Sequence, residues 1–134
     1  MKFYKTLIFS KWAKKEDVSE NALNNAIDEF LKGLYEAKLG KAMYKKRIPL
    51  KGKGKRGGAR SIIFYQIEKV LIFCFGYPKN VQEELDNSQR KKLEFLSSEF
   101  RKMKKSDFDN ACKAGKLIQI DRGQEDGNKK ENDS

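Results

Sequence analysis

The sequence predicts an α+β domain, in which a small antiparallel β-sheet is packed by N-terminal and C-terminal helices. The chain has 134 residues, enough for one domain with its own hydrophobic core. Apolar runs of strand character follow one another in the middle of the chain, and segments of helical periodicity lie before and after them. The expected order is β, α, β, β, β, α, α, β. Consecutive strands flanked by helices are typical of the α+β class.

The N-terminal part begins with a predicted strand over residues 2–9, which mix aromatic and β-branched side chains. A short helical turn over 11–15 follows. From Ser19 onward, apolar residues recur at i, i+3, i+4 and i+7, which predicts a helix with Ser19 as its N-cap. Gly33 is favoured over Gly40 as the residue that ends this helix. A single apolar stripe indicates one buried face.

The central part is predicted to form three strands. The first covers residues 42–50. The next two, 60–67 and 69–77, are joined by a tight turn at Glu68 and Lys69. This indicates a hairpin, although Glu-Lys is not a favoured turn pair. Because the last run is apolar almost throughout, we expect it to be a central strand covered on both faces.

The C-terminal part is predicted to hold two helices and a last strand. Residues 87–103 carry apolar side chains on one face, and Ser106 caps a shorter helix that ends at Gly115. A short strand over 116–120 closes the domain, which we place at 1–121. Residues 122–134 form a polar segment that we expect to be a disordered tail.

Composition limits the cellular context. The apolar run near the N-terminus covers only residues 6–9, whereas a signal peptide needs roughly 7 to 15 apolar residues and a membrane span about 18. A cytoplasmic protein without a membrane partner is therefore expected. Cys74 lies in an apolar run and Cys112 in a predicted helix, so both thiols are expected to be free.

Positive charge is concentrated in one segment. The formal net charge is +11, and residues 41–60 account for nine of these charges because they hold no acidic residue. Within them the stretch KGKGKRGGAR, residues 51–60, combines basic side chains with four glycines. Glycine lets the backbone approach a ligand closely, and Lys and Arg donate to phosphates, so the segment favours a nucleic-acid backbone as partner. The alternative is a solvated loop without a ligand. A P-loop is excluded, since the Gly-Lys-Ser/Thr ending is missing.

The available chemistry is restricted because the chain has no histidine. This removes the usual general base and most zinc sites, and no carboxylate pair stands out, so we expect neither metal nor cofactor. Lys, Arg and Tyr remain. Such side chains can cleave RNA without metal, since the 2′-hydroxyl supplies the nucleophile and cations stabilise the phosphorane. Clustered positive charge could lower a lysine pKa from about 10.4 towards a useful value.

A resemblance follows from these residues. KKRIPLKGKGKRGGAR and the following SIIFYQIEKVLIFCFGYPKN resemble the RelE/ParE toxin superfamily, in its HigB-like branch. The matching features are Lys45 with Arg47, a Gly-x-Gly loop, Gly57-Gly58-Ala59-Arg60 and Gly76-Tyr77-Pro78-Lys79-Asn80. The closing KAGKLIQI also fits, so the likeness covers about residues 1 to 121.

The resemblance implies a toxin of a type II toxin–antitoxin system. Many members cleave mRNA in the ribosomal A site, without metal, through 2′-hydroxyl attack. By position, Arg60 would stabilise the transition-state phosphate, Lys79 would face the phosphate, and Lys45 and Arg47 would share a strand face where the family places its acid/base lysines. Lys53 or Lys55 could hold that role instead. The implied RNA-binding residues are Lys51, Lys53, Lys55, Arg56 and Tyr77. The implied partners are mRNA, the ribosome and a cognate antitoxin, commonly a helix-turn-helix DNA-binding protein.

The chain also departs from the family pattern. Ala59 stands where an aromatic is usual, and Leu85 lies about where ribosome-dependent relatives place an aromatic. Tyr77 or Tyr65 could substitute, although Tyr65 in a hairpin is more typical of sheet packing. Arg60 could simply pair with a carboxylate.

Two other functions stay open. The superfamily also contains toxins that inhibit DNA gyrase by binding, and a basic RNA-binding protein of ribosomes is a third candidate.

Overall fold

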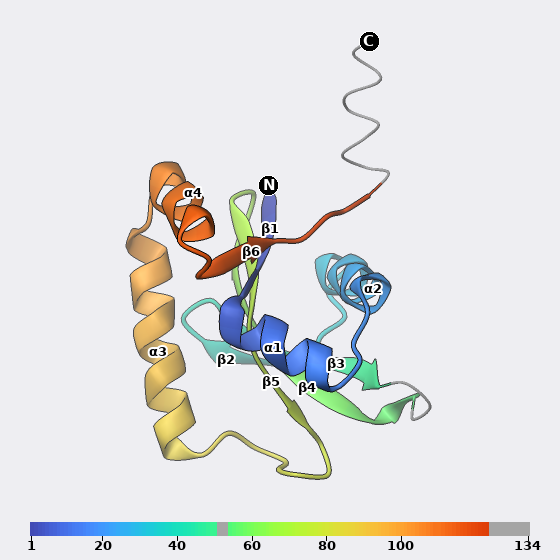
Figure 1. The fold of residues 1–134 in the computed structure, drawn as a ribbon. Coiled ribbons are helices and arrows are strands. Elements are labelled where there is room, and N and C mark those ends of the chain that lie inside the picture. The colour runs from blue at the N-terminus through green and yellow to red at the C-terminus, as the bar shows by residue number, and fades with distance from the viewer. Residues whose placement is uncertain (51–53, 124–134) are drawn as a thin grey trace.

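The computed structural model describes residues 1–50 and 54–123, with residues 54–57 described by their backbone alone. Within these ranges the chain forms one six-stranded sheet with helices on both of its faces (Figure 1). The α+β class is confirmed. In chain order the elements are β1 (Lys2–Thr6), α1 (Leu7–Lys15), α2 (Glu20–Leu31), β2 (Ala37–Gly40), β3 (Met43–Leu50), β4 (Gly54–Gln66), β5 (Val70–Pro78), α3 (Asn87–Lys102), α4 (Lys105–Lys113) and β6 (Leu117–Gln119).

The sheet runs in the order β2-β3-β4-β5-β1-β6. Strands β2 to β5 form an antiparallel meander, and β6 is antiparallel to β1. The exception is β1, which lies parallel to β5, with Lys2 opposite Val70. The sheet is therefore mostly antiparallel, as expected, and this parallel pair is a feature that was not predicted. The apolar strand β5 is buried over 70–74 and needs a neighbour on each side, and β1 supplies the second.

The helices form two layers. Helices α1 and α2 cover one face through Phe9, Leu23 and Ile27, which pack with Ile63 and Phe73 of the sheet. Helices α3 and α4 cover the other face through Leu93, Phe100 and Phe108, which pack with Phe64 and Ile72. We call these the α1/α2 face and the α3/α4 face. Helices α2 and α3 each bury one apolar stripe, as their periodicity predicted.

Two N-terminal boundaries differ from the expectation. Strand β1 ends at Thr6, because its hydroxyl accepts a hydrogen bond from Phe9 N at 3.1 Å and so caps a helix that begins at Leu7. The same hydroxyl donates to the Cys74 carbonyl oxygen at 3.0 Å, which fixes the helix start to β5. Helix α2 has Ser19 as its N-cap and stops at Leu31, before Gly33 with φ of 90°. Both α2 predictions are confirmed.

In the β2–β3 hairpin, β3 was predicted and β2 was not, because β2 has only four residues and follows α2 after a short connection. Its turn places Lys41 and Ala42 at positive φ, and Ser97 Oγ of α3 donates to the Lys41 carbonyl oxygen at 2.6 Å. The β4–β5 hairpin is confirmed, with Glu68 at φ of 60° in its turn.

In the C-terminal part, Asp86 caps α3 with a capping box, and α4 begins at Lys105 rather than after a Ser106 cap. Most of the predicted polar tail, from residue 124, lies outside the described residues. Arg122 donates to the Asn24 side-chain oxygen at 2.6 Å. None of the helices in the described ranges is both long and apolar enough to cross a membrane.

Candidate functional site

Two adjacent rows of residues cross strands β3, β4 and β5. Arg47, Arg60 and Tyr77 are aligned neighbours and form what we call the Arg60 row. Lys46, Ser61 and Gly76, one position along each strand, form the Lys46 row. Because successive side chains of a strand point to opposite faces, the two rows face opposite sides of the sheet. The Arg60 row lies on the α3/α4 face, because its member Tyr77 packs in the core of that face together with Ile62.

Arg60 is the most buried cation of this face, with a side chain only 8% exposed. Its Nε lies 2.7 Å from Glu36 Oε1, while its Nη1 is buried and has no hydrogen-bond partner among the described residues. A buried charged donor without a partner is costly, and a ligand that accepts its hydrogen bond would remove this cost. The alternative that Arg60 pairs with a carboxylate is thus realised, but the pairing leaves one end of the guanidinium uncommitted.

Glu36 holds the two arginines of the row together. Its other oxygen, Oε2, lies 2.8 Å from Arg47 Nε. The residue is fixed at the entry to β2, where its backbone N–H donates to the Lys45 carbonyl oxygen at 2.8 Å. Arg47 is 46% exposed, so the pair offers one fixed, buried guanidinium and one open to solvent.

Lys45 lies two residues before Arg47 and therefore projects from the same face. Its Nζ lies 3.4 Å from Glu84 Oε2, and the lysine side chain is 14% exposed whereas the glutamate is 67% exposed. An exposed ion pair of this length contributes little stability and is easily exchanged for another anion. Lys45 and Arg47 of β3 and Arg60 of β4 thus lie on the same face of the sheet.

Tyr77 lies in the core and is 2% exposed. Burial, and then Glu84, raise the pKa of its hydroxyl, while Arg60 opposes them. Its hydroxyl therefore lies in the field of the charged cluster and stays protonated at neutral pH. Because the ring faces are covered, the structure does not offer Tyr77 as a surface on which an RNA base could stack. Tyr65 also packs in the sheet, with its ring centroid 5.0 Å from that of Phe30, so its packing alternative is the one observed.

The remaining predicted residues lie at the edge of this cluster. Lys79 follows β5 and is half-buried, and its backbone N–H donates to the Gly58 carbonyl oxygen at 3.1 Å, next to the strand that carries Arg60. Lys51 and Lys53 lie outside the described residues. Lys55 and Arg56 belong to β4, but their side chains are likewise not described.

Glu36 and Glu84 are the site residues that the sequence analysis missed. No spacing pattern links them to the arginines, because Glu36 precedes a strand that was not predicted and Glu84 lies in the connection between β5 and α3. The alternation of apolar residues in EAKLG was the one available signal for β2.

The described residues offer few groups for metal binding or thiol chemistry. Within the described ranges no group of three or more acidic or thiol side chains is placed to hold a metal ion. Cys74 and Cys112 are free, and burial raises the pKa of the Cys74 thiol to about 12.

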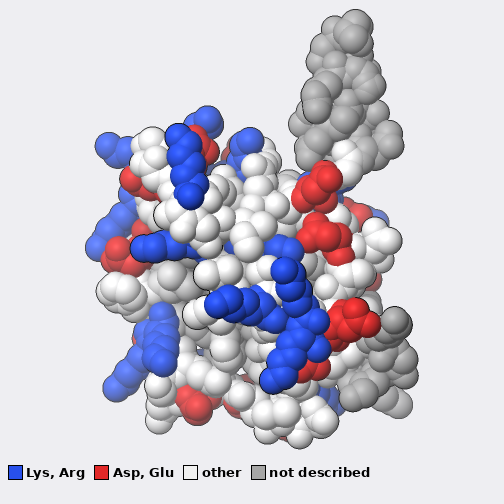
Figure 2. All heavy atoms as spheres, in the orientation of Figure 1, with Lys and Arg blue, Asp and Glu red and all other residues white. Residues whose placement is uncertain are grey.

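Basic side chains are also abundant outside this cluster. Figure 2 shows Lys and Arg gathered over α1 and along α3 on the face drawn there. The last turn of α1 carries Lys14 and Lys15, and that of α3 carries Arg101 and Lys102. A ligand with many negative charges would therefore be attracted by positive electrostatic potential over a large part of this surface.

Comparison with protein families gives a match over almost the whole length of the described domain. The family model described as the RelE toxin of the RelE / RelB toxin–antitoxin system matches residues 1–120. No curated protein matches the chain.

Proposed function

Since the chain belongs to the RelE toxin family, we propose that it is a metal-independent endoribonuclease that cleaves mRNA in the ribosomal A site by 2′-hydroxyl attack. The observation that carries this proposal is the fixed guanidinium of Arg60. It is buried, held at one end by Glu36, and has an uncommitted Nη1. A donor held in place before the substrate arrives is what stabilisation of a phosphorane requires, since no reorganisation is then needed in the transition state.

The proposed reaction uses the substrate's own nucleophile. The 2′-hydroxyl oxygen attacks the adjacent phosphorus and loses its proton to a base, and the bond to the 5′-oxygen breaks as that oxygen receives a proton. The products are a 2′,3′-cyclic phosphate and a free 5′-hydroxyl. The RNA must be held with the 2′-oxygen in line with the leaving oxygen, which the cations achieve by fixing the phosphate.

We assign the roles of the cations in this reaction from how exposed each side chain is. Arg47 would meet the incoming phosphate, and Arg60 would stabilise the charge that develops on it. Lys45 would donate a proton to the leaving oxygen, with Glu84 giving way to the RNA. Lys53 and Lys55 remain candidates for proton transfer, and Lys79 is the proposed further phosphate contact.

The proposed partners follow from this role. They are mRNA and the ribosome as target and a cognate antitoxin as inhibitor, which we expect to be a helix-turn-helix DNA-binding protein as in the HigB-like branch. An acidic antitoxin segment would suit a chain of net charge +11. A ParE-like toxin that binds and inhibits DNA gyrase is the second candidate. The partly buried cluster of cations on one face of the sheet favours the nuclease, because a binding toxin has no need of an uncommitted buried donor.

The test is primer extension on cellular mRNA after brief induction of the wild-type chain and of Arg60→Ala. The matched control is Lys91→Ala, which removes an exposed cation from α3. New 5′ ends inside translated frames are expected for the wild type and the control and not for Arg60→Ala. Intact mRNA in arrested cells would refute the proposal, and inhibition of DNA supercoiling by the purified chain would then establish the gyrase alternative.

A further inference from the structure

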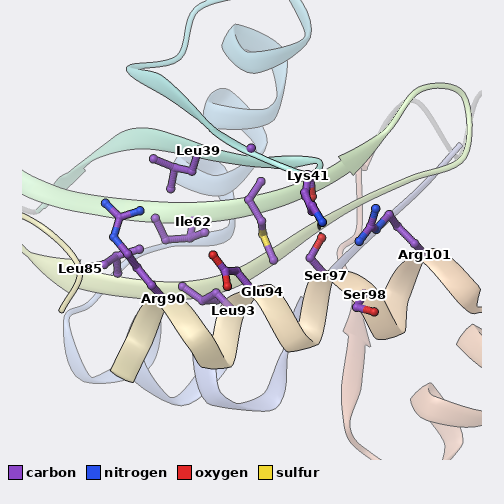
Figure 3. A pocket seen from close by; sticks show the side chains of 12 residues that line it. Leu39, Lys41, Ile62, Leu85, Arg90, Leu93, Glu94, Ser97, Ser98 and Arg101 are labelled. Carbon is purple, nitrogen blue, oxygen red and sulfur yellow. Dashed lines mark hydrogen bonds between the residues drawn. The ribbon is translucent and has the colours of Figure 1, made fainter. Parts of the chain in front are cut away.

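A groove of about 430 Å³ lies between α3 and the β2–β3 hairpin, beside the charged cluster (Figure 3). Its floor is aliphatic and includes Met43, Ile62 and Leu93. Three cations line it: Lys41 from the hairpin turn, and Arg90 and Arg101 from α3. The mechanism proposed above uses none of these three, so the groove calls for a ligand of its own.

The groove lies next to the Lys45–Glu84 ion pair. Ile62 in its floor is the cross-strand neighbour of Lys45, and Leu85 follows Glu84, the partner of that lysine. Arg90 lies close enough to the Tyr77 hydroxyl to oppose the rise in its pKa. These neighbours place one end of the groove on the same sheet face as the Arg60 row.

The cations are spaced along the groove rather than gathered at one point. Arg90 and Arg101 are three helical turns apart on α3, which is about 16 Å along its axis. Figure 3 shows them at opposite ends of the groove, with Ser97 and Lys41 between them. The hydrogen bond from Ser97 Oγ to the Lys41 carbonyl oxygen, 2.6 Å long, fixes the hairpin turn against α3. None of the three cations makes a salt bridge to another residue in the described ranges.

We propose that this groove binds single-stranded RNA, namely the two or three nucleotides that flank the scissile phosphate. The inference rests on the proposed function and adds to it a binding site outside the reacting centre. Successive phosphates would pair with Arg90, Lys41 and Arg101, and the bases would lie against the aliphatic floor. Glu94, which also lines the groove, would accept a hydrogen bond from the exocyclic amino group of adenine, cytosine or guanine.

An RNA strand fits these features better than a protein segment does. A strand supplies a negative charge at every nucleotide, which matches cations spread over the whole length of the groove. It also has to leave the reacting centre on one side or the other, and the groove lies beside Lys45, one of the cations assigned to that centre. A protein segment would need acidic residues placed to suit three separate cations.

The experiment measures binding of fluorescein-labelled 2′-O-methyl RNA by fluorescence anisotropy over a range of salt concentrations. This RNA lacks the 2′-hydroxyl and cannot be cleaved by the proposed reaction. A twelve-nucleotide and a four-nucleotide strand are compared. The variants are Arg101→Glu and its control Lys92→Glu, which makes the same change at an exposed position of α3 that does not line the groove.

Arg101→Glu is expected to weaken binding of the long strand roughly tenfold more than Lys92→Glu does, and to reduce the log–log salt slope by about 0.7. Both variants are expected to bind the short strand alike. Equal losses for the two variants on the long strand would overturn the proposal. So would unchanged RNA binding by Arg101→Glu together with failure of the antitoxin to neutralise it, which would assign the groove to a protein partner.

Primer extension separates this inference from the proposed function. A selective loss of long-strand binding without any new 5′ ends in cells would refute cleavage while the RNA groove stands. New 5′ ends that depend on Arg60, combined with equal binding by Arg101→Glu and Lys92→Glu, would refute the groove alone.

Discussion

The Lys46 row and the Arg60 row are one residue apart on the same three strands, yet they differ in almost every physical property. In the Lys46 row, Lys46 Nζ lies 2.6 Å from Glu29 Oε1 under α2, Ser61 is fully buried and Gly76 lies against Trp12. In the Arg60 row the cations share one carboxylate, and one guanidinium end has no partner in the described part of the chain.

The difference shows that a run of basic residues need not have one role. Strand alternation sends Lys46 to the α1/α2 face, where it is 5% exposed and paired, and sends its two neighbours to the other face. On the first face the charge belongs to the packing of α2. On the second it is left available to a ligand. Each substitution below tests one side of this division.

The largest effect is expected from Arg60→Ala. Removing the fixed guanidinium should lower the cleavage rate roughly 10²- to 10³-fold, because a preorganised donor at the developing charge is lost. Arg47→Ala, which removes the exposed arginine, should cost about tenfold, since it loses a contact made mainly in binding. Rates are measured on translating ribosomes, and circular dichroism checks the fold. Equal losses for both would remove the distinction between buried and exposed cations in the Arg60 row.

Gly76→Ala should disturb the packing of the Lys46 row. An added Cβ would lie less than 3.0 Å from ring carbons of Trp12, so the indole must move from its place on Phe9. Overpacking of this kind costs about 1–3 kcal/mol of the free energy of unfolding. Urea denaturation measures this loss. A variant as stable as the wild type would show that Trp12 can move freely, which would weaken the description of this face as closely packed.

Lys46→Met and Lys45→Met compare two adjacent lysines directly. Lys46→Met should lower the free energy of unfolding by about 1–2 kcal/mol, because it leaves Glu29 without this partner on a partly buried face. Activity per folded molecule should stay at the wild-type level. Lys45→Met should do the reverse. Denaturation and cleavage assays on both variants give the answer, and a shared loss of activity would mean that the two faces are coupled.

Glu36→Gln should have the most selective effect. Glutamine keeps the shape of the side chain but removes the charge between Arg47 and Arg60, so phosphate should bind somewhat more tightly while Arg60 is less firmly oriented. We expect kcat to fall about tenfold with a KM that is unchanged or lower. Glu84→Gln is the matched control and should change both constants less than twofold, since that carboxylate is exposed. A rise in KM without a change in kcat would contradict the positioning role of Glu36.

Much of the fold could be predicted because the pattern of each element was local. The α2 cap and its glycine stop, the β4–β5 hairpin and the covering of β5 on both faces all follow from short stretches of sequence. The pairing of β1 with β5 could not be predicted, because parallel neighbours are joined by a long crossover that leaves no local mark. The β2 strand was missed because four residues are too few for an alternation of apolar and polar side chains to stand out from chance.

The site was predicted in part for a related reason. Lys45, Arg47 and Arg60 were chosen from the basic run and the family resemblance, and strand register brings the two arginines opposite each other. Glu36 and Glu84 could not be found, because their roles depend on distances between segments far apart in the chain. The burial of the Tyr77 ring likewise depends on the packing of Leu85 and α3. Periodicity alone does not show which side chains of a strand stay accessible to a ligand.

The position of β1 has a consequence for the order of folding. Its partners are β5, with Phe3 opposite Leu71, and β6, with Tyr4 opposite Gln119, so its two neighbours come from the middle and the far end of the chain. The β3–β4–β5 meander needs only short loops and can assemble early, whereas β1 must close a long loop before it docks, and β6 a longer one. The strands that carry the arginines would therefore form first. The final, slowest step would be the seating of the N-terminal strand, completed when the Ile120 amide bonds to the Phe3 carbonyl oxygen.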